Sequence, residues 1–484
     1  MKSPITFDAL AEKARVGLLN IRIDSRKVEA GDIFVAMPGT AVDGGTFIAD
    51  ALARGASFIV CKAASAPANA GSASVLEVED PRATLGLLAA ERYGTTGIEF
   101  PVVGVTGTNG KTTCTYLLEH LFRSAGIVTG VLGTVSFRWP GYENPAPMTT
   151  PDNVFLHEML GQMDNAGVQV AFMEVSSHAL DQKRVSGVRF AGALMTNLTQ
   201  DHLDYHGDME SYFTAKSRIF LELPEKGKAC VVNADDPYGR RLLPQLEQGL
   251  GFSVQGNTVE GCQVLQGKIL ECGPEGLYLA MNLEGMEWEL RSPLVGAFNA
   301  SNLLGVQAMG LALGLPVETL KGLEGFMGVP GRMERIENDK GLHVFVDYAH
   351  TPDALENVLK ALRAAGFARV IAVFGCGGDR DRTKRPLMGQ AVCRHADIAV
   401  LTSDNPRTEN PVAIMADVKP GLSDCTEVVE EPDRKTALAR ALELARPGDA
   451  ILVAGKGHED YQVIGTEKIH FSDQETLREL MACA

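Results

Sequence analysis

The sequence lacks the features of membrane, secreted and nucleic-acid-binding proteins. No apolar run approaches the roughly 20 residues that a membrane-spanning helix needs, so we expect no membrane span. The first residues, MKSPITFDALAEKA, contain no basic region followed by an apolar run, and we therefore expect no signal peptide. The formal net charge of −16 disfavours nucleic acid as the main partner, because a surface that follows phosphates is basic.

Cysteines are few and scattered. There are nine, and no two form a Cys-x-x-Cys pair. An odd number without paired spacing suits a reducing compartment, so we expect a cytoplasmic protein. Cys114 and Cys376 stand beside polar loops, where we expect them to pack as small apolar side chains rather than to react.

The length predicts several domains. A chain of 484 residues suggests about three domains of roughly 150 residues each. The first segment mixes short predicted strands at 32–39 and 57–62 with a helical pattern at 49–56. We place the domain boundaries where the pattern of apolar and polar residues along the chain changes, and predict domains over residues 1–97, 98–329 and 330–484.

The middle of the chain alternates apolar strands with helical segments. Leu117, Leu118 and Leu121 form part of a helical stripe over 112–125. Such alternation favours an α/β fold with a largely parallel, doubly wound sheet. In the region 251–294, apolar and polar residues alternate in a different way. This pattern predicts a small β excursion, for which the sequence suggests no function. The predicted strands are 101–105, 168–175, 190–198 and 228–234.

A second α/β block begins near residue 329. Four predicted strands each run directly into a polar loop, namely AHTPD, CGGDRDRTKRP, SDNPRTENP or KGHEDYQ. Ligands bind beyond the carboxyl ends of the strands in open α/β sheets, so the four loops should share one face. These strands are 342–348, 369–375, 396–402 and 449–455.

The segment VGVTGTNGKTT (103–113) follows a strand and opens a helix. Backbone N–H groups of a Gly-rich turn and a helix N-terminus face phosphate oxygens favourably. Lys111 would reach the β- and γ-phosphates, and the hydroxyl of Thr112 or Thr113 would ligate Mg²⁺. Val105 stands where a strict Walker A motif has its first glycine, so an incidental Gly-rich turn is the alternative. The loop predicts a nucleoside triphosphate and leaves the acceptor open.

An ordered series of motifs resembles the Mur ligases. TGTNGKT (106–112) is followed by MTTPD, MEVSSHAL, TNLTQDHLDYHG, GAFNASN, GRME, DYAHTPD, GCGGDRD, DNPR and AGKGHEDYQ. The series extends from the DSR of residues 24–26 to near the C-terminus and is most similar to the Mur ligases that add diaminopimelate. One motif could arise by chance, whereas the ordered series argues for the family.

The resemblance implies a three-domain protein. A small N-terminal α/β domain binds uridine, a central P-loop-type domain binds ATP, and a C-terminal Rossmann-like domain brings the amino acid. The implied activity is ATP-dependent addition of meso-diaminopimelate to UDP-N-acetylmuramoyl-L-Ala-D-Glu through an acyl phosphate, in peptidoglycan precursor synthesis. Mg²⁺ is the implied cofactor and ATP the co-substrate. We expect a monomer whose partners are these small molecules.

The resemblance also assigns residues to each ligand. For ATP they are Gly107, Thr108, Asn109, Gly110, Lys111, Thr112, Thr113, Asn299, Asn302, Arg332, Asp347 and His350. For the UDP-muramoyl dipeptide they are Ile23, Ser25, Thr149, Thr150, Ser176, Gln182 and Arg184. For diaminopimelate they are Arg380, Asp404, Asn405, Pro406, Arg407, Gly455 and Glu459.

The implied Mg²⁺ ligands are Thr112, Glu174, His202 and Lys216. Glu174 ends a buried-strand pattern, where an unpaired carboxylate would be costly, so a metal or cation partner is expected. The loop around His202 also carries His206, for which the resemblance gives no role; oxygen ligands and ATP favour Mg²⁺ over a transition metal. Only the resemblance selects Lys216, as an N6-carboxylysine formed with CO₂. That chemistry needs a neutral amine, so burial must lower the pKa of Lys216.

The SDNPR segment (403–407) concerns the choice of amino acid. Proline stiffens the turn, and Arg407 presents a planar fork suited to a carboxylate. Arg380 could share that role, while Asp404, Asn405 and Glu459 suit an ammonium. Diaminopimelate ends in both groups, whereas lysine ends in an ammonium alone, which Arg407 would repel. The pattern therefore favours diaminopimelate.

Three alternatives remain open at the level of sequence. A Mur ligase that adds lysine or another amino acid would share most of these motifs. A folylpolyglutamate synthetase shares the use of ATP and glutamate, but the N-terminal segment and DNPR disfavour it. A catalytically silent nucleotide-binding scaffold would be expected to lose Lys111, Glu174 or His202, and the sequence retains all three.

Overall fold

A computed structural model describes residues 5–17, 19–39, 42–222 and 224–483. The chain forms two compact units. The first comprises Met1–Gly251, Val259–Gln263 and Ala308–Leu315, and the second comprises Phe252–Thr258, Val264–Gln307 and Pro316–Ala484. Each unit is built of helices and strands.

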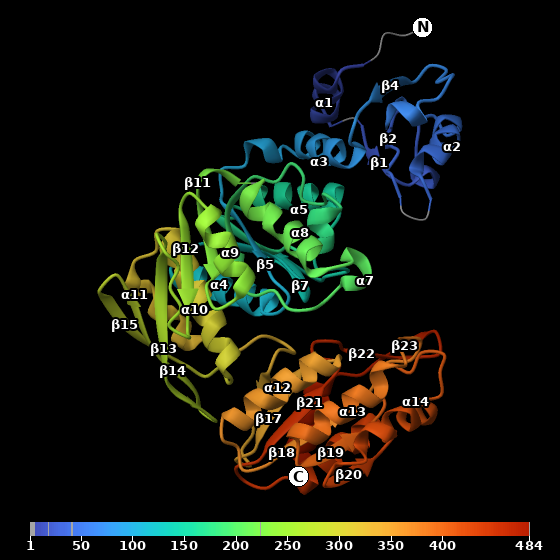
Figure 1. Cartoon of the computed structure of the whole chain (residues 1–484). Coiled ribbons are helices and arrows are strands. Elements are labelled where there is room, and N and C mark those ends of the chain that lie inside the picture. Colours follow the sequence, from blue (N-terminus) through green and yellow to red (C-terminus); the bar gives the residue numbers. More distant parts are fainter. Residues whose placement is uncertain (1–4, 18, 40–41, 223, 484) are drawn as a thin grey trace. The chain divides into compact units, whose positions relative to one another are not determined.

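The first unit begins with a four-stranded parallel sheet, drawn in blue in Figure 1. Apolar side chains of α1 and α3, including Leu10 and Leu88, pack against Ile33 on one face, while Ile48 of α2 packs with Phe34 on the other. The strands are β1 (Ile21–Arg22), β2 (Ile33–Val35), β3 (Phe58–Cys61) and β4 (Ser74–Glu77), and the helices are α1 (Phe7–Arg15), α2 (Ile48–Ala53) and α3 (Pro81–Arg92).

The second sheet of this unit has the strand order β12-β11-β10-β5-β9-β6-β7-β8. Strands β11, β10, β5, β9 and β6 pair in parallel, and β7 and β8 add an antiparallel hairpin. The four strands predicted from the sequence are confirmed as β5, β9, β10 and β11. The bounds are β5 (Val102–Thr106), β6 (Thr129–Leu132), β7 (Ser136–Trp139), β8 (Tyr142–Pro145), β9 (Val170–Glu174), β10 (Phe190–Met195), β11 (Pro224–Asn233) and β12 (Gly249–Ser253).

Six helices connect these strands. Leu117, Leu118 and Leu121 of α4 are buried, as the predicted helical stripe requires. The helices are α4 (Lys111–Ser124), α5 (Asn153–Asn165), α6 (Ser177–Asp181), α7 (Leu203–His206), α8 (Met209–Leu221) and α9 (Pro237–Leu242).

The second unit contains the β excursion predicted at 251–294. Strands β13 (Gln263–Gly273), β14 (Gly276–Leu283) and β15 (Met286–Ser292) pair antiparallel in sequence order. Helices α10 (Ala297–Ala312) and α11 (Val317–Leu320) follow them along the chain. The indole N–H of Trp288 donates to the Gln307 side chain at 2.7 Å, which satisfies both buried polar groups.

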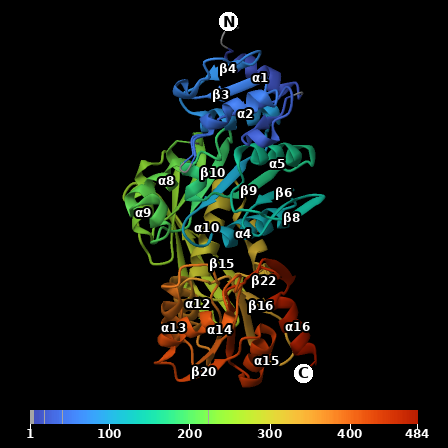
Figure 2. The ribbon, with the colours of Figure 1, turned by 90° about the vertical axis from the view of Figure 1, so that its right-hand side faces the viewer.

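The C-terminal part of the second unit is a doubly wound sheet of order β16-β17-β21-β18-β19-β20. All neighbours pair in parallel except β16 and β17. Alternate residues of each strand enter two cores: α12, α13 and α14 cover one face, and α15 and α16 cover the other, as Figure 2 shows. The strands are β16 (Glu334–Ile336), β17 (His343–Asp347), β18 (Val370–Phe374), β19 (Ile398–Leu401), β20 (Glu427–Glu430) and β21 (Ala450–Ala454). The helices are α12 (Pro352–Ala364), α13 (Lys384–His395), α14 (Pro411–Val418), α15 (Arg434–Leu444) and α16 (Asp473–Cys483).

The four predicted polar loops follow β17, β21, β18 and β19, which are consecutive parallel strands. Their carboxyl ends therefore meet at one edge, and the expectation that the loops share a face is confirmed. A separate hairpin, β22 (Tyr461–Ile464) and β23 (Glu467–His470), follows β21. The α/β fold class is confirmed, whereas the domain boundaries at 97/98 and 329/330 stay predictions.

Two further observations bear on the composition. No helix among the described residues is long and apolar enough to cross a membrane. Cys393 and Cys425 form a disulfide, with their Cα atoms 4.6 Å apart, which the scattered spacing did not predict. Cys114 and Cys376 are buried, and burial raises the pKa of both thiols, to about 12 for Cys376, so they are packing residues as expected.

Candidate active site

The loop between β5 and α4 has the backbone of a phosphate cradle. Gly107 has φ +146° and Gly110 has φ +86°, values that favour glycine. A Cβ atom at Gly107 would overlap the hydroxyl of Thr196. The two glycines therefore let the chain turn tightly before α4, where a helix N-terminus favours phosphate.

Residues that follow β10 hold this loop. The backbone N–H of Asn109 donates to the Asn197 side-chain oxygen at 3.0 Å, and the Asn197 amide donates back to the Asn109 carbonyl at 3.1 Å. The Thr108 backbone N–H donates to the Asn197 carbonyl at 2.9 Å. The Lys111 side chain lies over the loop, with Nζ 3.0 Å from the Gly107 carbonyl oxygen and 2.9 Å from that of Thr108. The cradle is thus preorganised by a neighbouring strand.

Glu174 lies at the end of β9 and is 1% exposed. Its carboxylate accepts hydrogen bonds from the Thr112 hydroxyl at 3.1 Å, the Thr134 hydroxyl at 2.9 Å and the Thr134 backbone N–H at 2.8 Å. The Thr134 hydroxyl is also 3.1 Å from that of Thr149. Two of the four predicted Mg²⁺ ligands, Thr112 and Glu174, are therefore in direct contact.

Lys216 of α8 is 2% exposed. Its Nζ atom donates to the Gly107 carbonyl at 2.8 Å and lies 4.8 Å from the Tyr212 ring centre. Burial, and then the nearby charge of Lys111, lower the pKa of Lys216 well below its usual value. The burial that carbamylation requires is present, at the edge of the phosphate loop.

His202 differs from the other three predicted ligands. It caps α7 with φ 54°, its side chain is half exposed, and its Nε2 lies 3.4 Å from the Asp201 carboxylate. Its ring meets the ring of His178 edge-on, with centroids 4.7 Å apart. Within the described ranges, no group of three or more His, Cys, Asp or Glu side chains is arranged to hold a metal ion.

Four of the residues predicted for the UDP-muramoyl dipeptide, Thr150, Ser176, Gln182 and Arg184, form a hydrogen-bonded row. The Thr150 hydroxyl lies 3.4 Å from that of Ser176 and accepts from the Ser176 backbone N–H at 3.1 Å. Arg184 donates twice to the Gln182 side-chain oxygen, at 3.1 and 2.7 Å, and once to the Thr150 carbonyl at 3.3 Å. This row places hydroxyls, an amide and a guanidinium together, which suits a ligand with carboxylates and amides.

The two predicted uridine-site residues lie at the end of β1. Ser25 is buried, and its hydrogen bond lowers the pKa of Asp50. Ile23 is 45% exposed and so offers an apolar surface on which a flat base could pack.

The ATP residues predicted in the second unit have local partners. The Asn302 amide donates to Asn299 at 3.1 Å, and both side chains are buried. Asp347 accepts from the backbone N–H of Met333 at 2.7 Å and of Ala349 at 2.8 Å, and burial raises its pKa. Two further contacts involve Tyr348: the Arg332 guanidinium lies 4.6 Å from its ring centre, and His350 Nδ1 lies 2.8 Å from its carbonyl oxygen.

Three of the predicted amino-acid residues surround a buried lysine. Lys456 is fully buried, with Nζ 3.3 Å from Asn405 Oδ1 and 3.6 Å from both Asp404 Oδ1 and Glu459 Oε2. The Asn405 amide donates to Glu459 at 3.0 Å. Asp404 Oδ1 is buried and accepts no hydrogen bond from any described residue. The Lys456 ammonium, 3.6 Å away, is the ion-pair partner of that oxygen.

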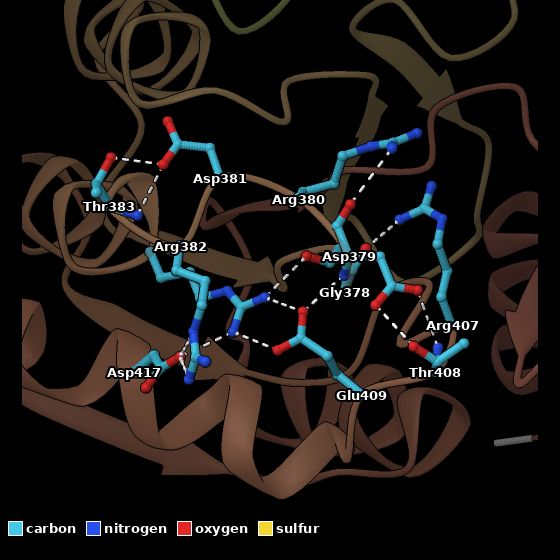
Figure 3. A network of polar contacts seen from close by, with 12 residues as sticks. Gly378, Asp379, Arg380, Asp381, Arg382, Thr383, Arg407, Thr408, Glu409 and Asp417 are labelled. Carbon is cyan, nitrogen blue, oxygen red and sulfur yellow. Dashed lines mark hydrogen bonds and ion pairs between the residues drawn. The ribbon is translucent and has the colours of Figure 1, made fainter.

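Arg407 lies beside this group in a strained turn. Its φ of 52° is left-handed, and its backbone is paired with the β22–β23 hairpin: its N–H donates to the Val463 carbonyl at 3.0 Å, and its carbonyl accepts from Gly465 at 2.7 Å. Its Nη1 donates to the Gly378 carbonyl at 2.7 Å, as Figure 3 shows. Arg380 donates a 3.4 Å hydrogen bond to the carbonyl of Asp379. Pro406 precedes the turn, and Gly455 approaches Asp404, whose Oδ2 would be 3.5 Å from an added Cβ.

Comparison with known proteins decides the family. Mur ligase models match three segments: the family catalytic domain over residues 18–93, the middle domain over 105–310 and the glutamate ligase domain over 331–457. The UDP-N-acetylmuramoyl-L-alanyl-D-glutamate--2,6-diaminopimelate ligase of Lawsonia intracellularis (strain PHE/MN1-00) is 55% identical over 463 residues, 96% of each chain. The chain belongs to the Mur ligase family.

Other relatives of this Mur ligase agree. The equally named ligase of Synechococcus elongatus (strain ATCC 33912 / PCC 7942 / FACHB-805) is 49% identical over 96% of this chain and 94% of that protein. A solved structure of a ligase with the same name is 34% identical, with a TM-score of 0.71 over 96% of this chain and 94% of that one. A folylpolyglutamate synthase from Mycobacterium tuberculosis shares 20% identity, with a TM-score of 0.59 over 78% of this chain and 92% of that one, which shows the fold alone.

Several residues of the site escaped sequence reasoning. Thr134 and Asn197 contact Glu174 and the phosphate loop from distant positions in the sequence. The buried Lys456 is the first residue of the KGHEDYQ loop. Its position between two glycines directly after a strand was the one local sign that it belongs to the site. In this Mur ligase, Glu174 and the phosphate loop thus have polar partners that are distant in the sequence.

Proposed function

We propose that this Mur ligase joins meso-diaminopimelate to the D-glutamyl carboxylate of UDP-N-acetylmuramoyl-L-alanyl-D-glutamate, with conversion of ATP to ADP and phosphate, in the cytoplasm. The observation that carries the proposal is the amino-acid site. Arg407 offers a fork for a carboxylate, and the carboxylates of Asp404 and Glu459, grouped with Asn405 around Lys456, suit an ammonium. The far end of diaminopimelate carries both groups. The relatives that share 55% and 49% identity bear the name of this activity.

The first chemical step is transfer of the γ-phosphoryl group. An oxygen of the D-glutamyl carboxylate attacks the γ-phosphorus, ADP leaves, and an acyl phosphate results. The loop 107–113 would bind the phosphates through backbone N–H groups, with Lys111 against the β- and γ-phosphates. Arg184 would bind a carboxylate of the dipeptide, because its guanidinium adjoins Gln182 and Thr150 in the hydroxyl-rich row.

The donor set around Glu174 fits Mg²⁺. The Thr112 hydroxyl and the Glu174 carboxylate are hard oxygen ligands, and a carbamylated Lys216 would supply further anionic oxygens, with His202 as the remaining ligand. Bound Mg²⁺ would offset the negative charge of the phosphates and of the developing transition state. The lowered pKa of Lys216 supports carbamylation, because only the neutral amine adds to CO₂.

The second step forms the amide bond. A neutral amine of diaminopimelate attacks the acyl carbon, phosphate leaves, and the nitrogen loses a proton. Arg407, Asp404, Asn405 and Glu459 would bind the other end of the amino acid, and Arg380 would assist with its carboxylate. Lysine lacks that carboxylate, so its terminal ammonium would face Arg407 without compensation.

Phosphate release tests the proposal. The assay contains ATP, Mg²⁺, bicarbonate and the UDP-muramoyl dipeptide, with meso-diaminopimelate, L-lysine or no amino acid. We expect turnover with diaminopimelate and little with the other two. Equal or greater turnover with lysine would disprove the assignment of the amino acid while leaving a ligase. Silence with every acceptor would contradict the activity itself.

A further inference from the structure

The Arg407 turn needs support, because a residue with a Cβ atom disfavours the left-handed region in which it lies. The β22–β23 hairpin supplies one side of that support through two backbone hydrogen bonds. The other side comes from the residues that follow, Thr408 and Glu409, and from the facing loop of residues 377–379 (Figure 3).

Several contacts join the 377–379 loop to the segment around Arg407. The Gly378 N–H donates to the Asn405 carbonyl at 2.9 Å. The Asp379 carboxylate accepts from the Thr408 N–H at 3.2 Å and from its hydroxyl at 2.8 Å. The Asp379 N–H donates to Glu409 Oε1 at 2.6 Å. The Gly378 carbonyl, which receives Arg407 Nη1, is thus fixed by its neighbours on both sides.

Arg385 lies behind these contacts. It is 1% exposed, in the first turn of α13. Nη1 donates to Glu409 Oε2 at 3.0 Å and to Asp417 Oδ2 at 2.8 Å, and Nη2 donates to Glu409 Oε1 at 2.7 Å. Nη2 also reaches the Gly377 carbonyl at 3.5 Å. One guanidinium therefore holds both oxygens of Glu409 and touches the facing loop.

Both arginines of the amino-acid site lie next to this loop. A Cβ atom on Gly377 would be 2.9 Å from Arg407 Nη1 and 3.8 Å from Arg380 Cγ. Any shift of residues 377–379 would therefore move the carbonyl to which Arg407 is bound and the segment from which Arg380 projects. A lysine cannot replace Arg385 at both Glu409 oxygens, because its ammonium is a point donor rather than a fork.

We infer that Arg385 is a positioning residue of the amino-acid site, which holds Glu409 and the 377–379 loop so that Arg407 presents its guanidinium to the carboxylate of the acceptor. The inference rests on the proposed function, because it names what fixes the group that selects diaminopimelate. Arg385 itself is too deeply buried to touch a substrate.

Steady-state kinetics of Arg385→Lys test the inference. We expect the KM for meso-diaminopimelate to rise about tenfold, with kcat and the KM for ATP within about twofold, because only the geometry of the amino-acid site loosens. The matched control is Arg382→Lys. Arg382 donates to the same Asp417 at 2.8 Å, but its side chain is 65% exposed, and its hydrogen bonds are to Asp417 rather than to Glu409. The KM values of the Arg382→Lys variant should therefore equal those of the wild type.

A second variant and a double variant separate positioning from general stability. Glu409→Gln should raise the same KM, and it carries the test if Arg385→Lys fails to fold. In an Arg407→Ala background, Arg385→Lys should raise the KM for meso-diaminopimelate little further, because both changes act on the same contact. An unchanged KM for diaminopimelate, an equal decline of all parameters, or fully multiplicative effects in the double variant would overturn the inference.

The wild-type assay distinguishes this inference from the proposed function. If the wild type uses another acceptor, the proposed function fails, and the KM of the variants is measured for that acceptor, so that Arg385 is still tested. If the wild type uses diaminopimelate and both variants keep its KM, the proposed function stands and only the role of Arg385 is rejected.

Discussion

The side-chain nitrogen of Lys216 donates a hydrogen bond to the carbonyl of Gly107 across 2.8 Å, inside the protein. A buried amine is therefore tied to the first glycine of the phosphate loop. Its pKa is lowered by burial first and by Lys111 second. This contact joins the phosphate loop to the residue proposed to be carbamylated, and the lowered pKa of Lys216 makes the stability of the fold depend on pH.

Replacement of Lys216 by Met should stabilise the first unit and abolish activity. Below the ordinary pKa of 10.5, Lys216 binds a proton in the unfolded protein more tightly than in the folded protein, where its pKa is lowered. The buried amine therefore lowers the free energy of unfolding, by about 1.4 kcal/mol for each pH unit by which the pKa is lowered. The cost shrinks as pH rises towards 10.5. Thermal unfolding at pH 7 and pH 9.5 checks this: the advantage of Lys216→Met should be smaller at the higher pH. An advantage that grows with pH would contradict the sign.

Carbamylation of Lys216 should be visible directly. Wild-type protein in carbon-13 bicarbonate should show a carbamate resonance in NMR spectra that Lys216→Met lacks. Removal of CO₂ from the buffers should lower kcat, and added bicarbonate should restore it. A carbamate signal that persists in the variant would assign the modification to another lysine.

Glu174→Gln should weaken the use of Mg²⁺. The amide is of the same size, and its one oxygen can still accept from the Thr112 and Thr134 hydroxyls. Its NH2 group cannot accept from the Thr134 backbone N–H, and the side chain lacks the charge that binds a divalent cation. We expect the Mg²⁺ concentration for half-maximal activity to rise about 10- to 100-fold. Titration of activity with MgCl₂ measures it, with Glu99→Gln, an exposed position, as control. A metal dependence equal to that of the wild type would remove Glu174 from the ligand set.

Gly377→Ala should impair the amino-acid site with little loss of stability. The new methyl group would lie 2.9 Å from the flexible end of Arg407, which moves more easily than backbone. We expect the KM for diaminopimelate to rise about tenfold while the melting temperature changes little. Gly273→Ala is the control, because a Cβ atom there meets nothing within 4 Å. Equal effects of the two substitutions would count against the contact.

Lys456→Met should destabilise the second unit. It leaves the buried Asp404 and the partly buried Glu459 without their shared cation, at a cost of about 3 kcal/mol for a buried charge cluster. Chemical denaturation gives the change. Lys468→Met serves as the comparison, because Lys468 lies on an exposed strand. A loss below about 0.5 kcal/mol would show that Lys456 contributes little there.

The sequence predicted those parts of the molecule for which the evidence lies within one continuous segment of the chain. The phosphate loop follows from glycines, Lys111 and Thr112 between a strand and a helix, and the parallel strands follow from short apolar runs. Contacts that form only in the tertiary structure could not be predicted from the sequence, because Thr134 and Asn197 lie in no local motif for these contacts. Lys456 lies in a polar loop, where a lysine is ordinarily exposed, but in the structure it is buried. Burial of Lys216 followed from a resemblance rather than from its helix, where a lysine is ordinarily exposed. The disulfide between Cys393 and Cys425 was missed because the two residues lie 32 positions apart without a motif.

A competition experiment tests the central claim most directly. Equal concentrations of meso-diaminopimelate and L-lysine are incubated with the protein, ATP, Mg²⁺ and UDP-N-acetylmuramoyl-L-Ala-D-Glu, and the product is identified by mass spectrometry. The account predicts that the diaminopimelate adduct dominates and that Arg407→Ala reduces this preference. A lysine adduct as the main product of the wild type would contradict it.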